Sequence, residues 1–220
     1  RPFQVNLGTG GDSIRAVVIS DLHDHEFGEN NEKLAEKIKE QEPDLILMDG
    51  DMLNEDSGDA SVPLELIGSL SGTAPIYYSL GNHEENYIDS GHTELAEQLE
   101  AAGAVVLDRS YVDLEVNGVQ LRLGGMYDYA FGLNGNNDAL SAPSDTLAFL
   151  QDFQNPDRVK IMLAHRPDSF IFGDASKVWD VDLVISGHNH GGQIVVPFLG
   201  GLYGGDQGWF PEYIHGLYEK

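Results

Sequence analysis

Short apolar runs rich in β-branched residues alternate along the chain with segments of helical periodicity. Runs of this length and composition are typical of strands that are buried on both faces of a parallel sheet. The pattern predicts five such strands, at residues 14–20, 44–48, 75–80, 159–164 and 181–186.

The intervening segments carry apolar residues four positions apart, which is the spacing of one helix face. Three pairs show it: Leu34 and Ile38, Leu66 and Leu70, and Leu95 and Leu99. Gly103 fits the position just past a helix end, and residues 144–153 predict a fourth helix. Two further apolar segments, 111–116 and 119–126, flank Asn117-Gly118, which predicts a hairpin.

Strands that alternate with helices indicate an α/β fold, and the hairpin adds antiparallel strands to a mixed sheet. We expect residues 1–220 to form one domain, because there is no internal repeat and no linker-like stretch. Residues 51–61, 124–143 and 197–215 are predicted to be long loops, which in a compact domain are usually functional or mobile.

The composition excludes several classes of protein. Acidic residues outnumber basic ones by 37 to 12, and the net charge of −25 argues against general nucleic-acid binding. The absence of cysteine excludes disulfides, zinc-thiolate sites and thiol catalysis. No apolar run approaches the roughly 20 residues that span a bilayer. Because the chain opens with Arg1, we expect that an upstream segment was removed.

Possible metal ligands follow every one of the five predicted strands. Ligands of open α/β sheets bind outside the carboxyl ends of the strands, so these side chains are expected to converge. The five clusters are Asp21-Leu22-His23, Gly50-Asp51, Gly81-Asn82-His83-Glu84, His165 and Gly187-His188-Asn189-His190. Any one of them would be weak evidence, whereas five in this order favour a site over chance.

The local spacing supports convergence. Asp21 and His23 are two residues apart, as are the two histidines of the last cluster, so each pair is expected to project from one side of an extended segment. Gly50, Gly81 and Gly187 are expected to let the backbone turn sharply and approach a bound ion. Imidazole and carboxylate ligands without thiolate suit Mn²⁺, Fe or Zn²⁺ rather than Ca²⁺.

The five ordered blocks resemble those of the calcineurin-like metallophosphoesterases. The resemblance spans residues 21–190 and implies a four-layer α/β/β/α sandwich with mixed sheets and two divalent metal ions, Mn²⁺ first, with Fe, Zn²⁺ or Ni²⁺ as alternatives. It implies that one ion is held by Asp21, His23, Asp51 and His190, and the other by Asp51, Asn82, His165 and His188. Asp51 would then bridge, and His83 would face the substrate.

The segments 163–168, 190–194 and 216–218 resemble a bacterial, often membrane-anchored branch of phosphodiesterases in this family. The resemblance implies hydrolysis of a phosphodiester or pyrophosphate bond by a metal-bridging hydroxide, with His83 as general acid. The expected partner is a phosphate-ester small molecule or a lipid or nucleotide headgroup. The expected location is extracytoplasmic, anchored through a segment absent from this chain or secreted, with the cytoplasm as the alternative.

Two features depart from the branch. Asp24-His25 stands where smaller residues are expected, and relatives usually continue into further strands beyond the position of Lys220.

Other interpretations remain open at this stage. Glu84 would orient His83 or a metal-bound water, or simply favour a helix start. Arg166 would clamp a substrate phosphate or form an ordinary ion pair. A phosphoprotein or small-molecule phosphomonoesterase is the alternative enzyme, disfavoured because Asp51-Met52-Leu53-Asn54 lacks the usual Asp-Arg pair. A metal-free interaction scaffold is the alternative of another class, and metal analysis would distinguish it.

Overall fold

The computed structural model describes all residues except 1, 9–12, 193, 197–199 and 205–206. All five strands predicted from apolar runs are present, with both ends of each strand within two residues of the predicted bounds. They are β1 (Ala16–Ile19), β2 (Leu45–Asp49), β3 (Ile76–Ser79), β7 (Val159–Leu163) and β8 (Leu183–Ile185).

Two four-stranded sheets organise the chain. The first has the order β1-β2-β3-β4 and is parallel throughout; β4 (Ala104–Leu107) was not predicted. The second has the order β5-β6-β7-β8 and is mixed. Its antiparallel pair is the predicted hairpin, β5 (Ser110–Val116) and β6 (Val119–Gly125), joined at Asn117-Gly118 with positive φ at both residues.

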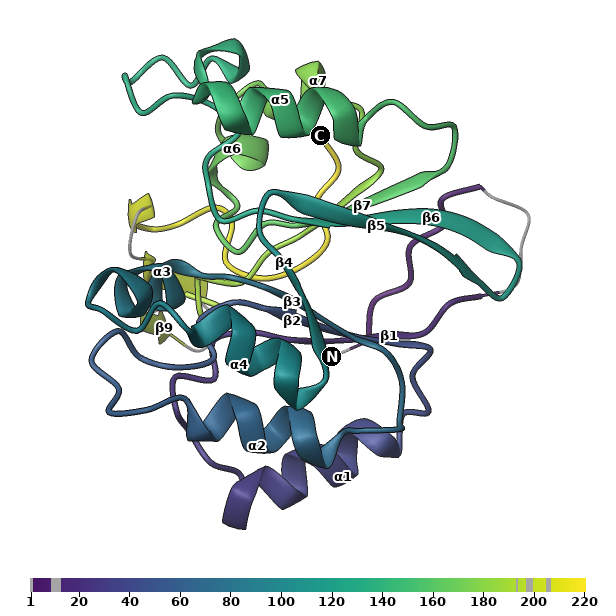
Figure 1. Cartoon of the computed structure of the whole chain (residues 1–220). Helices are drawn as coiled ribbons and strands as arrows, with labels where there is room; N and C mark the ends of the chain where they lie inside the picture. Colours follow the sequence, from purple (N-terminus) through teal and green to yellow (C-terminus); the bar gives the residue numbers. More distant parts are fainter. Residues whose placement is uncertain (1, 9–12, 193, 197–199, 205–206) are drawn as a thin grey trace.

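Helices cover the outer faces of both sheets (Figure 1). The first sheet packs against α1 (Glu32–Lys39), α2 (Ser61–Ser69) and α4 (Leu95–Ala102), and α3 (Asn82–Asp89) follows β3 directly. The second packs against α5 (Ser144–Phe153), α6 (Asp168–Ile171) and α7 (Ala175–Val178). Short 3-10 turns lie at Glu29–Asn31 and Ala139–Ser141. The predicted helices are therefore confirmed, including the end of α4 at Gly103, where φ is 115°.

Three apolar cores separate the four layers. β2 shows how one strand serves two of them: Ile46 and Met48 face the helices, whereas Leu45 and Leu47 face the second sheet. Alternate residues of a strand point to opposite faces, so a strand between two layers must be apolar throughout. The expected α/β/β/α sandwich is therefore the observed architecture.

Two expectations about the strands and tail were wrong. β1 and β8 lie at sheet edges and are not buried on both faces; Val18 of β1 is 46% exposed. The segment 197–215, expected to be a loop, contributes strands where it is described. β10 (Gly200–Gly204) pairs antiparallel with β9 (Ile194–Val196) and β11 (Gly208–Trp209) in a third sheet, while residues 197–199 and 205–206 lie outside the described part.

In the part of the chain that the structure describes, no helix has the length and apolar character needed to cross a bilayer.

Candidate metal centre

The predicted ligands meet at one end of the two sheets. Their side chains form three overlapping groups in which one ligand atom from each residue lies within 4.8 Å of the others. One group holds Asp21, His23 and His190, and another holds Asp51, His165 and His188. These two groups contain six of the seven ligands that the family resemblance implies, but the first group lacks Asp51 and neither group includes Asn82. The third combines His23, Asp51 and His83.

Asp51 lies at the middle of these groups. Its Oδ2 atom is 3.0 Å from Nε2 of His165 and 3.9 Å from Nε2 of both His23 and His83. The residue is only 1% exposed, and burial raises its pKa, but neighbouring His165 and His83 lower the pKa below its ordinary value overall. The carboxylate is therefore favoured, as a bridging ligand requires.

Asp21 links the two ends of the sequence. Its Oδ1 atom accepts a hydrogen bond of 2.9 Å from the backbone N–H of His188. The same atom is 3.5 Å from Nε2 of His190 and 3.8 Å from Nε2 of His165. Residues 167 positions apart are thus held against each other by a carboxylate that also faces the centre.

The loops that carry these residues are not extended, contrary to expectation. Asp21, His23, Asp51, His188 and His190 have φ between 48° and 65°, the left-handed region that side chains other than glycine rarely adopt. Strain of this kind persists where the surroundings impose it and is concentrated at functional sites. Tight turns, not alternation along a strand, bring both members of each pair to the centre.

Glycines permit the close approach of these loops, as predicted. A Cβ on Gly50, whose φ is 74°, would lie 2.6 Å from the backbone of Gly81. A Cβ on Gly187 would lie 2.5 Å from Oδ2 of Asp21. Contacts this short are not tolerated, so no larger residue fits there without moving a ligand loop.

Two residues that were not predicted from the sequence as part of the site orient histidine rings. Asn54 accepts a hydrogen bond from Nδ1 of His23 at 3.1 Å, while its amide donates to the His23 carbonyl and to Asp24. The backbone carbonyl of Asp49 accepts one from Nδ1 of His165 at 2.5 Å. Each contact fixes the tautomer and leaves Nε2 facing the centre, as in protein metal sites generally.

The ionisation of His165 follows from its surroundings. Burial lowers its pKa, but the carboxylates of Asp51, Asp49 and Asp21 outweigh burial and raise the pKa to about 9. Asp49 is itself wholly buried, and burial raises its pKa well above the ordinary value despite the proximity of His165.

Glu84 caps the start of α3, as one of the two interpretations expected, and it also supports the Asp51 loop. Its buried carboxylate accepts hydrogen bonds from the backbone N–H groups of Gly81, Asp51 and Met52 at 2.8–2.9 Å. It also accepts one from the Tyr78 hydroxyl at 2.6 Å. These bonds hold the loops that follow β2 and β3 against each other at the centre.

The residues fit a divalent metal by an independent test. Oδ1 of Asn82 is buried yet has no hydrogen-bond partner among the described residues. Buried polar atoms are almost always paired, so an unpaired oxygen within a predicted ligand set is unusual. Amide oxygen, imidazole nitrogen and carboxylate together form a donor set for transition metals. A metal ion would satisfy the Asn82 oxygen.

His83 lies beside the ligands in a defined tautomer. Asn82 and His83 begin α3, so they do not stand at an extended strand end as expected, although consecutive helix residues also point apart. Nδ1 of His83 accepts a hydrogen bond of 3.1 Å from the Glu55 N–H. In the neutral ring the proton is therefore on Nε2, which faces Asp51.

Arg166 follows His165 directly, and its side chain lies between the Asp168 carboxylate and the Tyr129 ring. Its Nε atom is 3.7 Å from Asp168, and its guanidinium carbon is 4.8 Å from the centre of the Tyr129 ring. These contacts fit the ordinary ion pair considered for it. A role in substrate binding remains a prediction.

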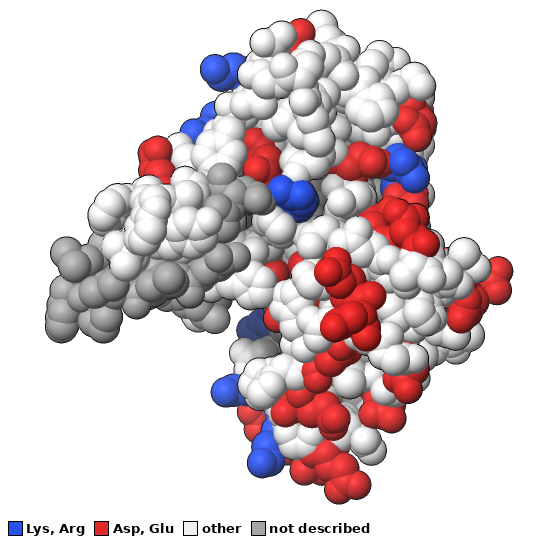
Figure 2. All heavy atoms as spheres, turned by 90° about the vertical axis from the view of Figure 1, so that its left-hand side faces the viewer, with Lys and Arg blue, Asp and Glu red and all other residues white. Residues whose placement is uncertain are grey.

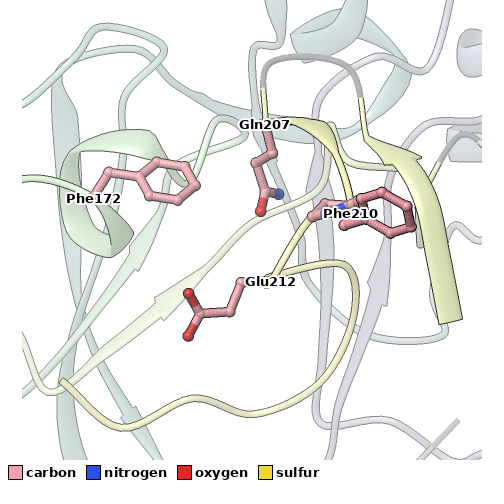
Figure 3. A pocket seen from close by; sticks show the side chains of 5 residues that line it. Phe172, Gln207, Phe210 and Glu212 are labelled. Carbon is pink, nitrogen blue, oxygen red and sulfur yellow. The ribbon is translucent and has the colours of Figure 1, made fainter.

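A hollow of about 330 Å³ lies apart from these ligands in the fold. Phe172 forms one wall and Phe210 the other, with Gln207 and Glu212 between them (Figure 3). Pro211 completes the lining, which contains none of the seven predicted ligands. The hollow is therefore not the metal centre.

Comparison with known proteins agrees with this geometry. The family model described as calcineurin-like phosphoesterase matches residues 14–192. The chain is 30% identical over 212 residues to an uncharacterised metallophosphoesterase of Campylobacter jejuni, covering 94% of this chain and 50% of that protein. It is 30% identical over 162 residues to phosphodiesterase YaeI of Escherichia coli, covering 73% and 54%. The chain thus spans about half the length of these two relatives.

Structural similarity gives the same fold. A putative 5'-nucleotidase from Staphylococcus aureus superposes with a TM-score of 0.53 at 19% identity, covering 84% of this chain and 46% of that one. The family uses divalent metals, and the strand-end clusters described above are where this chain could hold them. The chain therefore belongs to the calcineurin-like phosphoesterase family.

Proposed function

We propose that the protein is a dinuclear metal-dependent phosphoesterase that hydrolyses a phosphodiester or pyrophosphate bond. The observation that carries the proposal is the set of three ligand groups, which are joined through His23 and Asp51. The unpaired Asn82 oxygen supports metal binding independently. A metal-free scaffold would have no use for the seven histidines and aspartates of these groups at one place.

The local charge explains how an acidic protein could accept a phosphate. Asp and Glu side chains gather over much of the face that carries α3 (Figure 2), in keeping with a net charge of −25. Two divalent ions would bring four positive charges, of which Asp21 and Asp51 neutralise two. Bound ions are the largest local charges in such a site, so a surplus of about +2 would attract a phosphate there.

Divalent ions at this centre would supply Lewis acidity and an activated water near neutral pH. The chain itself would orient the reaction. Asp51 and Asp21, held by backbone N–H groups, fix the ligand geometry. His83 presents its Nε2 toward Asp51 and assists the leaving oxygen as general acid.

The diester preference rests on a similarity to a relative. YaeI of Escherichia coli is named a phosphodiesterase, and its match covers 73% of this chain. The alternative is a phosphomonoesterase, which the Asp51-Met52-Leu53-Asn54 block disfavours. In the structure, Asn54 of this block contacts the His23 ring. Mn²⁺ is the proposed ion, and a location outside the cytoplasm remains a prediction that cell fractionation of the full-length product would test.

A hydrolysis panel tests the proposal. Purified protein would be assayed with a phosphomonoester, a phosphodiester, a nucleotide-sugar pyrophosphate and a phosphopeptide, each with Mn²⁺, Zn²⁺ or Mg²⁺. We expect metal-dependent cleavage of the diester or pyrophosphate, abolished in Asp51→Asn. Preferential cleavage of the monoester would favour the alternative, and no metal binding at all would favour the scaffold.

A further inference from the structure

Glu55, in the loop that follows β2, makes two hydrogen bonds to α3. Its backbone N–H donates to Nδ1 of His83 at 3.1 Å, and its carboxylate oxygen Oε2 accepts from Nδ2 of Asn86 at 2.6 Å. His83 and Asn86 are three positions apart on the helix, so they are neighbours on its surface. Glu55 therefore contacts the proposed general acid with its backbone and the next turn of the same helix with its side chain.

The His83 ring is held by few contacts. Its side chain is 26% exposed, so packing alone does not fix its orientation. The His23 ring contacts it edge to face, with 4.6 Å between the ring centres, and Asp51 lies 3.9 Å from its Nε2. The Glu55 N–H is the donor that the structure places at the opposite nitrogen, Nδ1. A shift of this N–H would free the ring to turn its Nε2 away from the centre.

The position of the Glu55 N–H depends in turn on how its loop is anchored. The Ser57 N–H donates to the Asn54 carbonyl at 3.1 Å, which closes a turn around Glu55. Side-chain contacts of this turn lead to the loop after β1. Toward α3, the hydrogen bonds recorded for residues 53–59, all of which the structure describes, are the two made by Glu55. Asn86 is thus the residue of α3 that holds the Glu55 side chain.

We propose that Asn86 and Glu55 are positioning residues for the reaction, because their hydrogen bond keeps the Glu55 N–H at Nδ1 of His83 and so keeps Nε2 directed at the leaving oxygen. This proposal rests on the proposed function, in which His83 is the general acid. Neither side chain is a predicted metal ligand, and both act through the His83 ring. A catalytic group must be held close to its productive geometry, since small displacements lower the rate strongly.

Asn86→Ala removes the donor and tests the proposal in the complete, Mn²⁺-loaded protein. For a phosphodiester with an alkyl leaving group, we expect kcat to fall about 3–10-fold, the range that loss of one hydrogen bond gives. KM and bound metal should stay unchanged. For a diester with a nitrophenolate leaving group, which departs without a proton, the loss should nearly vanish, because only the general acid is displaced.

Two variants of Glu55 separate its hydrogen bond from its charge. Glu55→Gln keeps an oxygen that can accept from Asn86, so it should retain the wild-type kcat. Glu55→Ala keeps the backbone N–H but loses the acceptor, so it should match Asn86→Ala. The double variant should be no slower than either single variant, because all three lack the same bond. Gln120→Ala is the matched control, since Gln120 donates to Glu115 on the exposed surface of the β5–β6 hairpin.

Exchange of the Glu55 amide hydrogen, followed by NMR in the metal-free protein, gives a readout that does not depend on activity. A hydrogen-bonded amide exchanges only when its bond opens, so the rate reports how firmly the N–H is held. We expect exchange at Glu55 to be about 3–10-fold faster in Asn86→Ala and unchanged in Gln120→Ala.

The outcomes distinguish this proposal from the proposed function. Wild-type kcat in Asn86→Ala, equal losses for both leaving groups, loss of bound metal, or unchanged exchange at Glu55 would each overturn the proposal. If Asn86→Ala does not fold, Glu55→Ala decides by the same criteria. A wild-type protein without metal-dependent hydrolysis would contradict the proposed function, and the exchange rate would still decide whether Asn86 holds the contact with His83.

Discussion

Metal binding should displace a proton from His165, and this makes affinity depend on pH in a calculable way. The ring has a pKa of about 9 because nearby carboxylates outweigh its burial. Its Nδ1 already donates to the Asp49 carbonyl, so the titrating proton occupies Nε2, the atom that a metal needs. At pH 7 about 1% of such rings are neutral, which lowers apparent affinity about 100-fold from its plateau.

The assay is Mn²⁺ titration calorimetry between pH 7 and 8.5 in buffers of different protonation enthalpy. An ordinary histidine is already mostly neutral above pH 7, so it contributes little there. We expect affinity to rise about tenfold per pH unit and about one proton to be released per protein at pH 7. His165→Asn should abolish this release.

The same pKa predicts the stability of the metal-free protein. A histidine whose pKa is raised on folding stabilises the fold fully below its unfolded pKa, about 6.5. That contribution should be lost as pH rises from about 6.5 through 9.

An Mn²⁺ affinity that is constant between pH 7 and 8.5, with no proton release, would refute the reasoning about His165.

Three further predictions concern other residues of the centre. Asp51→Asn should release both ions, whereas His190→Asn should release one, and metal analysis of the purified variants would measure this. Loss of only one ion from Asp51→Asn would count against Asp51 as the bridging ligand. His83→Ala should retain both ions while diester hydrolysis falls by roughly 10²–10⁴, and less for a nitrophenolate leaving group; equal losses for good and poor leaving groups would exclude the general acid. Glu84→Gln should lower the free energy of unfolding by about 2 kcal/mol in urea titrations; an unchanged value would mean that its four hydrogen bonds contribute little.

Local patterns were sufficient for most of the fold. The Asn117-Gly118 turn and the Leu95, Leu99 and Gly103 spacing specify a hairpin and a helix end through short-range chemistry. β4 was missed because it follows α4 after Gly103 alone, with no separate turn signal. The exposure of β1 and β8 could not be predicted either, since the order of strands in a sheet is set by tertiary pairing.

The candidate site, like the fold, could be predicted from the sequence only in part. Convergence of the strand-end residues followed from the topology of α/β sheets. The support given by Glu84 and Asn54 depends on loops that meet only in the folded chain, 31–33 residues away in sequence.

The most direct test of the account is a crystal structure of the Mn²⁺-loaded protein with anomalous scattering measured at the manganese edge. The account predicts two anomalous peaks roughly 3.5–4 Å apart. The Asp51 carboxylate should touch both, with His190 at one peak and Asn82 at the other. A single peak, or two peaks that do not share Asp51, would contradict the dinuclear centre.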